Sequence, residues 1–214
     1  MFRSYSSHKS TLEAGLNLSS GATVVYPQIR YRYFVNDAFA LRAVMDLATQ
    51  SEVERVYQNE NFTGNEGTKT VSTRALGLQT GFEYHPYGTK RLSPYFGVTV
   101  GLNFGRDKEV WKDYNDTLGI PGTGFYDFQT NAEIKAPFLA FQTGAVAGLD
   151  FYLIENLYMG VEMNWNFVAR NNNARELSYS DADGISFNRT IAPSSREVTT
   201  QFGVLPAIRL GWRF

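Results

Sequence analysis

The chain is defined first by what it lacks. It has no cysteine in 214 residues, which excludes disulfide scaffolds and thiolate metal centres. No apolar run approaches the ~18 residues that a transmembrane helix needs. The formal net charge is −1, which gives no reason to expect a nucleic-acid partner. Residues 1–10 contain no apolar core, so they do not resemble a signal peptide, and we expect them to form an N-terminal tail.

Helical periodicity is also nearly missing, and strict alternation of apolar and polar positions takes its place. Aromatic residues make up 15% of the chain, with 13 Tyr and 16 Phe. Alternation with period two is typical of strands whose two faces meet different surroundings. It predicts eight strands within residues 11–214, at residues 11–19, 25–35, 38–48, 74–85, 93–105, 138–153, 157–168 and 200–214.

The connections between these segments alternate in length. Short turns follow the second, fourth and sixth segments, whereas residues 49–73, 106–136 and 169–199 are long connections that we expect to be loops. Short turns on one rim and long loops on the other are typical of a transmembrane β-barrel. The sequence therefore predicts an all-β fold, an eight-stranded antiparallel up-and-down transmembrane barrel.

The two rows of alternating side chains differ in a way that favours a membrane. In a soluble lipocalin-like barrel, the alternative fold, the apolar row would face inward and the other row would be solvated. That second row instead combines many glycines with five acids and five arginines. Small residues suit a narrow lumen, and Arg is the base that pairs bidentately with shielded carboxylates. We predict a lumen salt-bridge network of Glu13, Arg30, Arg32, Arg42, Asp46, Glu83, Asp150, Glu162, Arg209 and Arg213.

Three segments carry a resemblance to a known family. Residues 92–97 (LSPYFG) and 150–167 (DFYLIENLYMGVEMNWNF) resemble strands of the small outer-membrane β-barrel family of Gram-negative bacteria, which includes the OmpA transmembrane domain and porin-like members. The style is similar to that of Bacteroidetes members. The final strand, with Leu210, Trp212 and Phe214, resembles the assembly signal that the barrel assembly machinery reads.

This resemblance covers residues 11–214 and implies a location and a set of partners. It implies the bacterial outer membrane, with periplasmic termini, a periplasmic tail at residues 1–10 and extracellular long loops. The implied partners are outer-membrane lipid and lipopolysaccharide, the barrel assembly machinery and other outer-membrane proteins.

Little in the sequence points to catalysis. The chain has two histidines, His8 in the tail and His85 on the turn rim, so a histidine-based site at the outer surface is not expected. We predict no enzyme activity, no cofactor and no metal site. The expected function is a non-catalytic structural or interaction protein, or an accessory subunit of an outer-membrane assembly. The alternative is a narrow channel or a carrier for small apolar molecules.

Aromatic side chains in the second long connection leave one question open. Trp111, Tyr114, Tyr126 and Phe128 form a candidate loop contact surface. The same residues would also suit a loop that packs down onto the barrel rim.

Overall fold

The computed structural model describes residues 9–18, 25–57, 66–89, 91–112, 116–120, 124–128, 131–180, 186–203 and 208–214. Regular structure in these ranges consists of β-strands. The same ranges contain no helix that is long and apolar enough to span a membrane.

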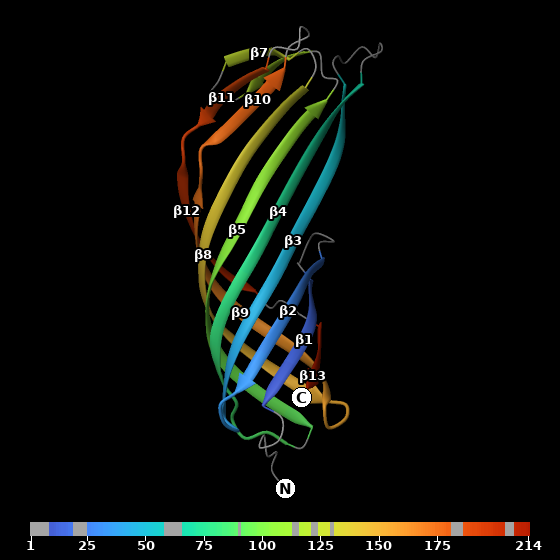
Figure 1. The fold of residues 1–214 in the computed structure, drawn as a ribbon, viewed down its shortest axis with the longest axis vertical. Coiled ribbons are helices and arrows are strands. Elements are labelled where there is room, and N and C mark those ends of the chain that lie inside the picture. The colour runs from blue at the N-terminus through green and yellow to red at the C-terminus, as the bar shows by residue number, and fades with distance from the viewer. Residues whose placement is uncertain are drawn as a thin grey trace.

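Eight strands follow one another around a closed antiparallel ring (Figure 1). They are β1 (Ser10–Leu18), β2 (Val25–Phe34), β3 (Phe39–Tyr57), β4 (Glu66–Tyr84), β5 (Leu92–Lys112), β8 (Asn131–Tyr152), β9 (Leu157–Asn172) and β13 (Ile208–Arg213). Ring order equals chain order, so the barrel is of the up-and-down type. The prediction of an eight-stranded antiparallel barrel is confirmed.

The ring closes between the first and last strands. β1 pairs with β13 from Thr11 opposite Arg213 to Leu16 opposite Ile208. The N–H of Ser10 donates to the carbonyl of Phe214 at 3.1 Å, and the N–H of Phe214 donates back at 2.9 Å. Lys9 and Phe214, the first and last described residues, therefore lie at one end of the barrel, together with the short connections after β2, β4 and β8 (Figure 1). We call this the turn end and the opposite end the loop end.

The last predicted strand, residues 200–214, is described in two parts. β12 (Ser195–Gly203) and β13 both pair with β9. From Gly203 to Arg209 the chain advances six positions, whereas their partners Asn164 and Gly160 are four positions apart. The registers of β12 and β13 on β9 therefore differ by two residues. Residues 204–207 lie outside the described residues.

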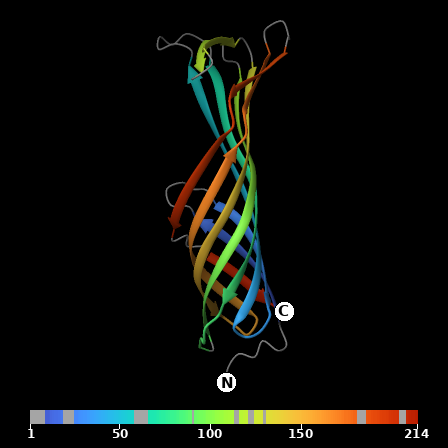
Figure 2. The same ribbon diagram turned by 90° about the vertical axis from the view of Figure 1, so that its left-hand side faces the viewer.

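The prediction that the long connections are loops is wrong for much of their length. β3, β4, β5, β8 and β9 run on past the ends of β1 and β2, and Figures 1 and 2 show the resulting extension at the loop end. β10 (Arg175–Ser180) pairs with β8, and β11 (Ser186–Ala192) pairs with β10. A separate hairpin joins β6 (Asp116–Ile120) to β7 (Gly124–Phe128).

The physical reason for this error lies in the exposure of the extension. On β3, residues 51–55 are exposed at consecutive positions, so both faces meet water. A strand that is wet on both sides has no need to alternate apolar and polar side chains. The alternation that marks the membrane-spanning segments is therefore absent from this part of β3.

The membrane-spanning wall is apolar outside and charged inside. On β5 the outward residues Phe96, Val98, Val100, Leu102 and Phe104 are 41–60% exposed. The largest buried side chains include Arg30, Arg32, Arg209, Glu13 and Glu83, each at most 1% exposed. This inversion of an ordinary protein core suits hydrocarbon outside and a filled lumen inside.

The outward assignment of the apolar face makes a quantitative prediction. Val100 lies in the middle of the β5 row, so Val100→Arg should lower the free energy of unfolding by about 2–4 kcal/mol in lipid vesicles. Ser51→Arg is the control, because Ser51 is exposed on the extension, and should cost about 1 kcal/mol or less. Urea unfolding followed by tryptophan fluorescence measures both. Equal and small effects would mean that this face does not meet lipid.

Candidate functional site

Charged and hydroxyl groups from every strand of the ring meet inside the barrel near the turn end. The set contains four arginines and four carboxylates, so its formal charges cancel. Its members are Glu13 of β1, Arg30 and Arg32 of β2, Arg42 of β3, Glu83 of β4, Tyr95 of β5, Asp150 of β8, Tyr158 and Glu162 of β9 and Arg209 of β13. We call these ten residues the plug network.

Glu162 is one centre of the plug network. Arg30 donates to its two carboxylate oxygens at 2.7 and 2.9 Å in a bidentate pair. Arg42 donates to the same two oxygens at 3.1 and 3.2 Å. The hydroxyl of Tyr95 donates to Oε2 at 2.6 Å. A single carboxylate thus satisfies three donors from three strands.

Arg32 is the other centre and joins three carboxylates. Its nitrogens lie 2.6 Å from Glu13, 3.2 Å from Glu83 and 2.8 Å from Asp150. Arg42 connects the two centres, because it also lies 3.1 Å from Glu83. Arg42 and Glu162 are 120 positions apart in the sequence, so the network ties distant strands together.

Arg209, on the last strand, connects the plug network to the first strand. It donates to Glu13 at 2.6 Å and to Asp150 at 3.2 Å. Since Glu13 lies on β1 and Arg209 on β13, this ion pair crosses the seam at which the barrel closes.

Two tyrosines that the sequence analysis missed complete the network. Tyr95 accepts from Arg209 at 2.6 Å while donating to Glu162, and Tyr158 accepts from Arg32 while donating to Glu13, both at 2.9 Å. Glycines make room for both rings: a Cβ at Gly148 would overlap Tyr95, and one at Gly211 would overlap Tyr158. Both tyrosines share the inner row with the charged residues, and that position was the available signal.

His85 extends the network toward the turn end. It is 5% exposed, and its ring nitrogens lie 3.1 Å from Glu83 and 3.4 Å from the Ser93 hydroxyl. The Phe34 and Tyr95 rings pack beside it at 5.1 and 5.4 Å between centroids. The end of the lumen is thus filled with packed rings.

Above the plug network lies a polar cavity of about 530 Å³. Arg42 and Glu162 border it below, and Arg170 and Glu197 are among the residues that line it toward the loop end. Much of its wall consists of amides: Gln28, Gln79, Asn103, Gln142, Asn164 and Asn166. We call this cavity the cup.

The structure places Asp46 in the cup rather than among the ion pairs of the plug network. Gln28 and Gln79 donate to its two oxygens at 2.6 and 2.8 Å. Arg213 is buried on β13 in register with Thr11, at the turn end. The other eight charged residues of the predicted set are the eight charged members of the plug network.

The remaining predicted site residues lie on the outer wall or in the extension. Leu210, Trp212 and Phe214 are outward-facing and 50–53% exposed. Trp111 is half-buried and packs against a small apolar core of Ala132, Ile134 and Leu177 in the extension. Tyr114 lies outside the described residues. Tyr126 and Phe128 belong to β7, and their side chains also lie outside what the structure describes.

Residues 18–214 match the sequence model of the Putative OmpA-OmpF-like porin family. The chain belongs to this family. The predicted relationship to OmpA-like and porin-like barrels and the outer-membrane location are thereby confirmed. Within the described ranges, no group of three or more His, Cys, Asp or Glu side chains is placed to hold a metal ion.

Solved structures of two outer-membrane proteins are similar over nearly the whole chain. A major outer membrane protein of Thermus thermophilus is 15% identical, with a TM-score of 0.49, over 97% of this chain and all of that one (100%). The outer membrane protease OmpT of Escherichia coli is 10% identical, with a TM-score of 0.33, over 96% of this chain and 93% of that one. No curated protein sequence matches the chain.

The plug network predicts a large difference between buried and exposed carboxylates. Glu162→Gln keeps the shape but removes the charge that Arg30 and Arg42 share, and should cost about 3–5 kcal/mol of unfolding free energy. Glu133→Gln is the control, because Glu133 pairs with two partly exposed lysines in the extension, and should cost about 1 kcal/mol or less. Denaturant unfolding in detergent micelles measures both. Similar losses for the two variants would show that the network does not stabilise the barrel.

Proposed function

We propose that this porin-family member is a non-catalytic structural or interaction protein of the outer membrane, whose barrel is closed to solutes. The observation that carries this proposal is the plug network. All eight strands of the ring contribute to it, and it fills the part of the lumen near the turn end with mutually paired groups. An eight-stranded barrel has an interior that side chains alone can fill.

The proposed orientation puts the turn end in the periplasm and the extension outside the cell. Outer-membrane barrels have short periplasmic turns and long extracellular loops. Ser10, Phe214 and the three short connections share the turn end (Figure 1). In this orientation the cup opens toward the outside, and the extension is the part of the protein that partners reach first.

The two alternative functions, a narrow channel and a carrier for small apolar molecules, agree less well with the side chains that line the lumen. A channel would require ions to pass the paired charges of the plug network. A carrier for small apolar molecules would require an apolar cavity, whereas the cup is lined largely by amides and charged groups, which are costly to desolvate against an apolar ligand.

Three side chains near the turn end are arranged like the catalytic triad of a hydrolase, but their burial and contacts favour a structural role. Ser93, His85 and Glu83 stand in the order nucleophile, base and carboxylate. Ser93 and His85 are each 5% exposed, so a substrate carbonyl has no access to the hydroxyl. Glu83 is already engaged by Arg32 and Arg42 at 3.2 and 3.1 Å.

Measuring the conductance of planar lipid bilayers that contain the protein tests the proposal that the lumen is closed. The purified protein should insert without stepwise openings, whereas a general porin of about 16 strands, which holds an aqueous channel, supplies the positive control. Arg42→Ala with Glu162→Ala removes a balanced pair from the plug network and should raise the conductance.

The matched control removes a balanced pair above the plug. Arg170 and Asp107, 2.6 Å apart, lie in the extension, so Arg170→Ala with Asp107→Ala should leave the conductance at the low level of the native protein. Steady large openings of the native protein would refute the proposal.

A further inference from the structure

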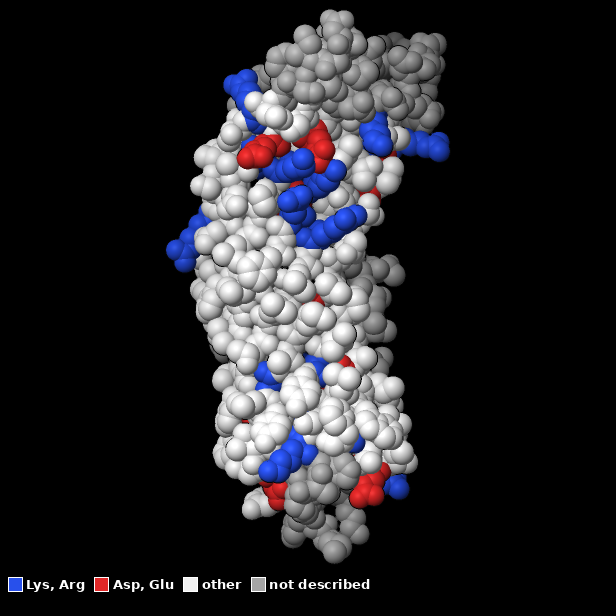
Figure 3. All heavy atoms as spheres, in the orientation of Figure 1, with Lys and Arg blue, Asp and Glu red and all other residues white. Residues whose placement is uncertain are grey.

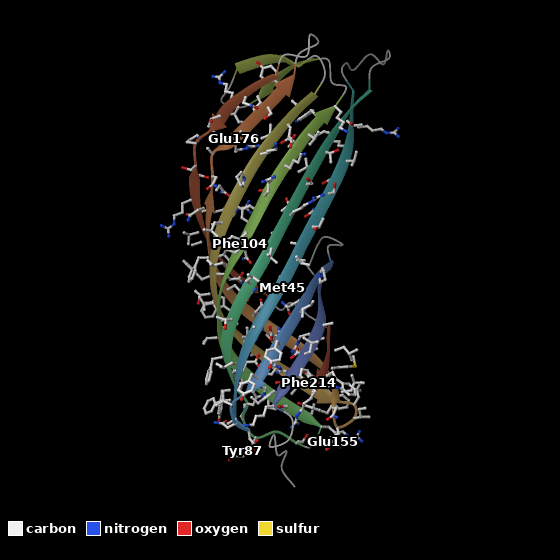
Figure 4. All side chains as sticks on the ribbon, viewed as in Figure 1. Met45, Tyr87, Phe104, Glu155, Glu176 and Phe214 are labelled. Carbon is white, nitrogen blue, oxygen red and sulfur yellow. The ribbon has the colours of Figure 1, made fainter. Side chains whose placement is uncertain are left out.

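A basic cluster lies on the outer surface where the apolar belt ends. Figure 3 shows Lys and Arg side chains gathered on the upper part of the face formed by β3, β4, β5 and β8, above a zone of uncharged residues. Arg74 of β4, Arg106 and Lys108 of β5 and Lys135 of β8 occupy outward positions there. Figure 4 labels Phe104 below this region and Glu176 above it.

Arg74 and Arg106 stand directly opposite each other on neighbouring strands. Both are exposed and both point outward, because Thr73 and Asp107 beside them form a hydrogen bond on the inner face. Side chains opposite each other have Cβ atoms about 4.5–5.5 Å apart, and like charges so placed repel. Among the described residues, no carboxylate forms an ion pair with either guanidinium.

The neighbouring lysines are partly neutralised by acids. Glu133 lies 2.7 Å from Lys108 and 3.3 Å from Lys135. The hydrogen bond from Lys108 holds the pKa of this carboxyl below its usual value, so it is charged at neutral pH. Glu176 is in register with Lys135 and adds a second acid. The positive charge that no described acid neutralises therefore lies at Arg74 and Arg106.

The position of the cluster fits the headgroups of a lipid leaflet. Leu76, Phe104 and Leu139 form the last apolar row, and Arg74, Arg106 and Pro137 form the next outward row. Successive outward residues of a strand are about 7 Å apart. The arginines thus stand within one step of the hydrocarbon boundary.

An apolar groove of about 700 Å³ runs along the outer wall below the arginines. Ala43, Thr80 and Gly101 are among its smaller lining residues, and Met45, Val100 and Phe104 are among its larger ones. A groove of this composition accommodates an acyl chain. It favours a lipid over a free anion as the ligand of the basic cluster.

We propose that Arg74 and Arg106, with Lys108 beside them, bind a phosphate group of lipid A, whose acyl chains occupy the groove below. Guanidinium groups bind phosphate bidentately, and a phosphate between them would replace repulsion by two charge-assisted pairs. In the membrane this rests on the proposed orientation, because lipid A faces the outside. Binding by the purified protein is independent of that orientation and of whether the lumen conducts.

Native mass spectrometry of the purified full chain in detergent tests the proposal with two probes, bisphosphorylated lipid A and enzymatically dephosphorylated lipid A. The native protein should bind the phosphorylated form about tenfold more tightly or better. Arg74→Gln with Arg106→Gln should abolish this preference and leave binding of the dephosphorylated form unchanged.

The control variant is Arg55→Gln with Arg196→Gln, which removes the same charge from exposed positions on β3 and β12 and should retain the preference. Heat-dependent gel mobility confirms that each barrel is folded. Equal binding of the two lipids by the native protein would overturn the proposal, as would equal losses in the two double variants. Displacement of bound lipid A by inorganic phosphate alone would assign the cluster to free anions and overturn the lipid site.

Discussion

The fold depends on cancelling charges in a space from which water is excluded. Moving an isolated ion out of water costs several kcal/mol even after the protein relaxes, so four buried arginines require partners with good geometry. The plug network supplies four carboxylates and two tyrosine hydroxyls at hydrogen-bonding distance. Because each strand of the ring contributes a member, removing any strand would take a hydrogen-bond or ion-pair partner from a buried charge. Closure of the barrel therefore brings together the groups that pair in the network.

This constraint explains the inverted composition of the wall. The inner row must accommodate long arginines and two tyrosine rings, so it uses glycine where a ring crosses, as at Gly148 and Gly211. The outer row is free to be apolar, since it meets hydrocarbon. Farther toward the loop end the inner groups become amides around the cup, and the extension gains a small core of its own around Leu177. Along the barrel axis, from the turn end to the loop end, the interior is thus lined first by ion pairs, then by amides and finally by apolar side chains.

The sequence alone was sufficient to predict the eight-stranded ring and the face of the wall on which each charged residue lies, because both follow from alternation with period two. It was insufficient to predict which charged residues pair with one another. Arg30 and Glu162 lie 132 positions apart and meet across the lumen, and no local pattern encodes that distance. Asp46 shares the inner row yet sits one layer higher, among amides. The sequence did not reveal the role of Tyr95 and Tyr158, because an inward-facing tyrosine can simply occupy space without forming hydrogen bonds to charged groups. The extension was missed because part of its wall, such as residues 51–55 of β3, is exposed on both faces, and because its apolar core around Leu177 involves few residues.

The central claim is that the plug network separates the cup from the turn end. The chain has no cysteine, so Asn166→Cys places a single thiol in the wall of the cup. A membrane-impermeant, charged maleimide applied to oriented membranes should label this thiol from the loop end and leave it unlabelled from the turn end. Labelling from both ends at similar rates would show that solutes pass the network and would contradict the claim.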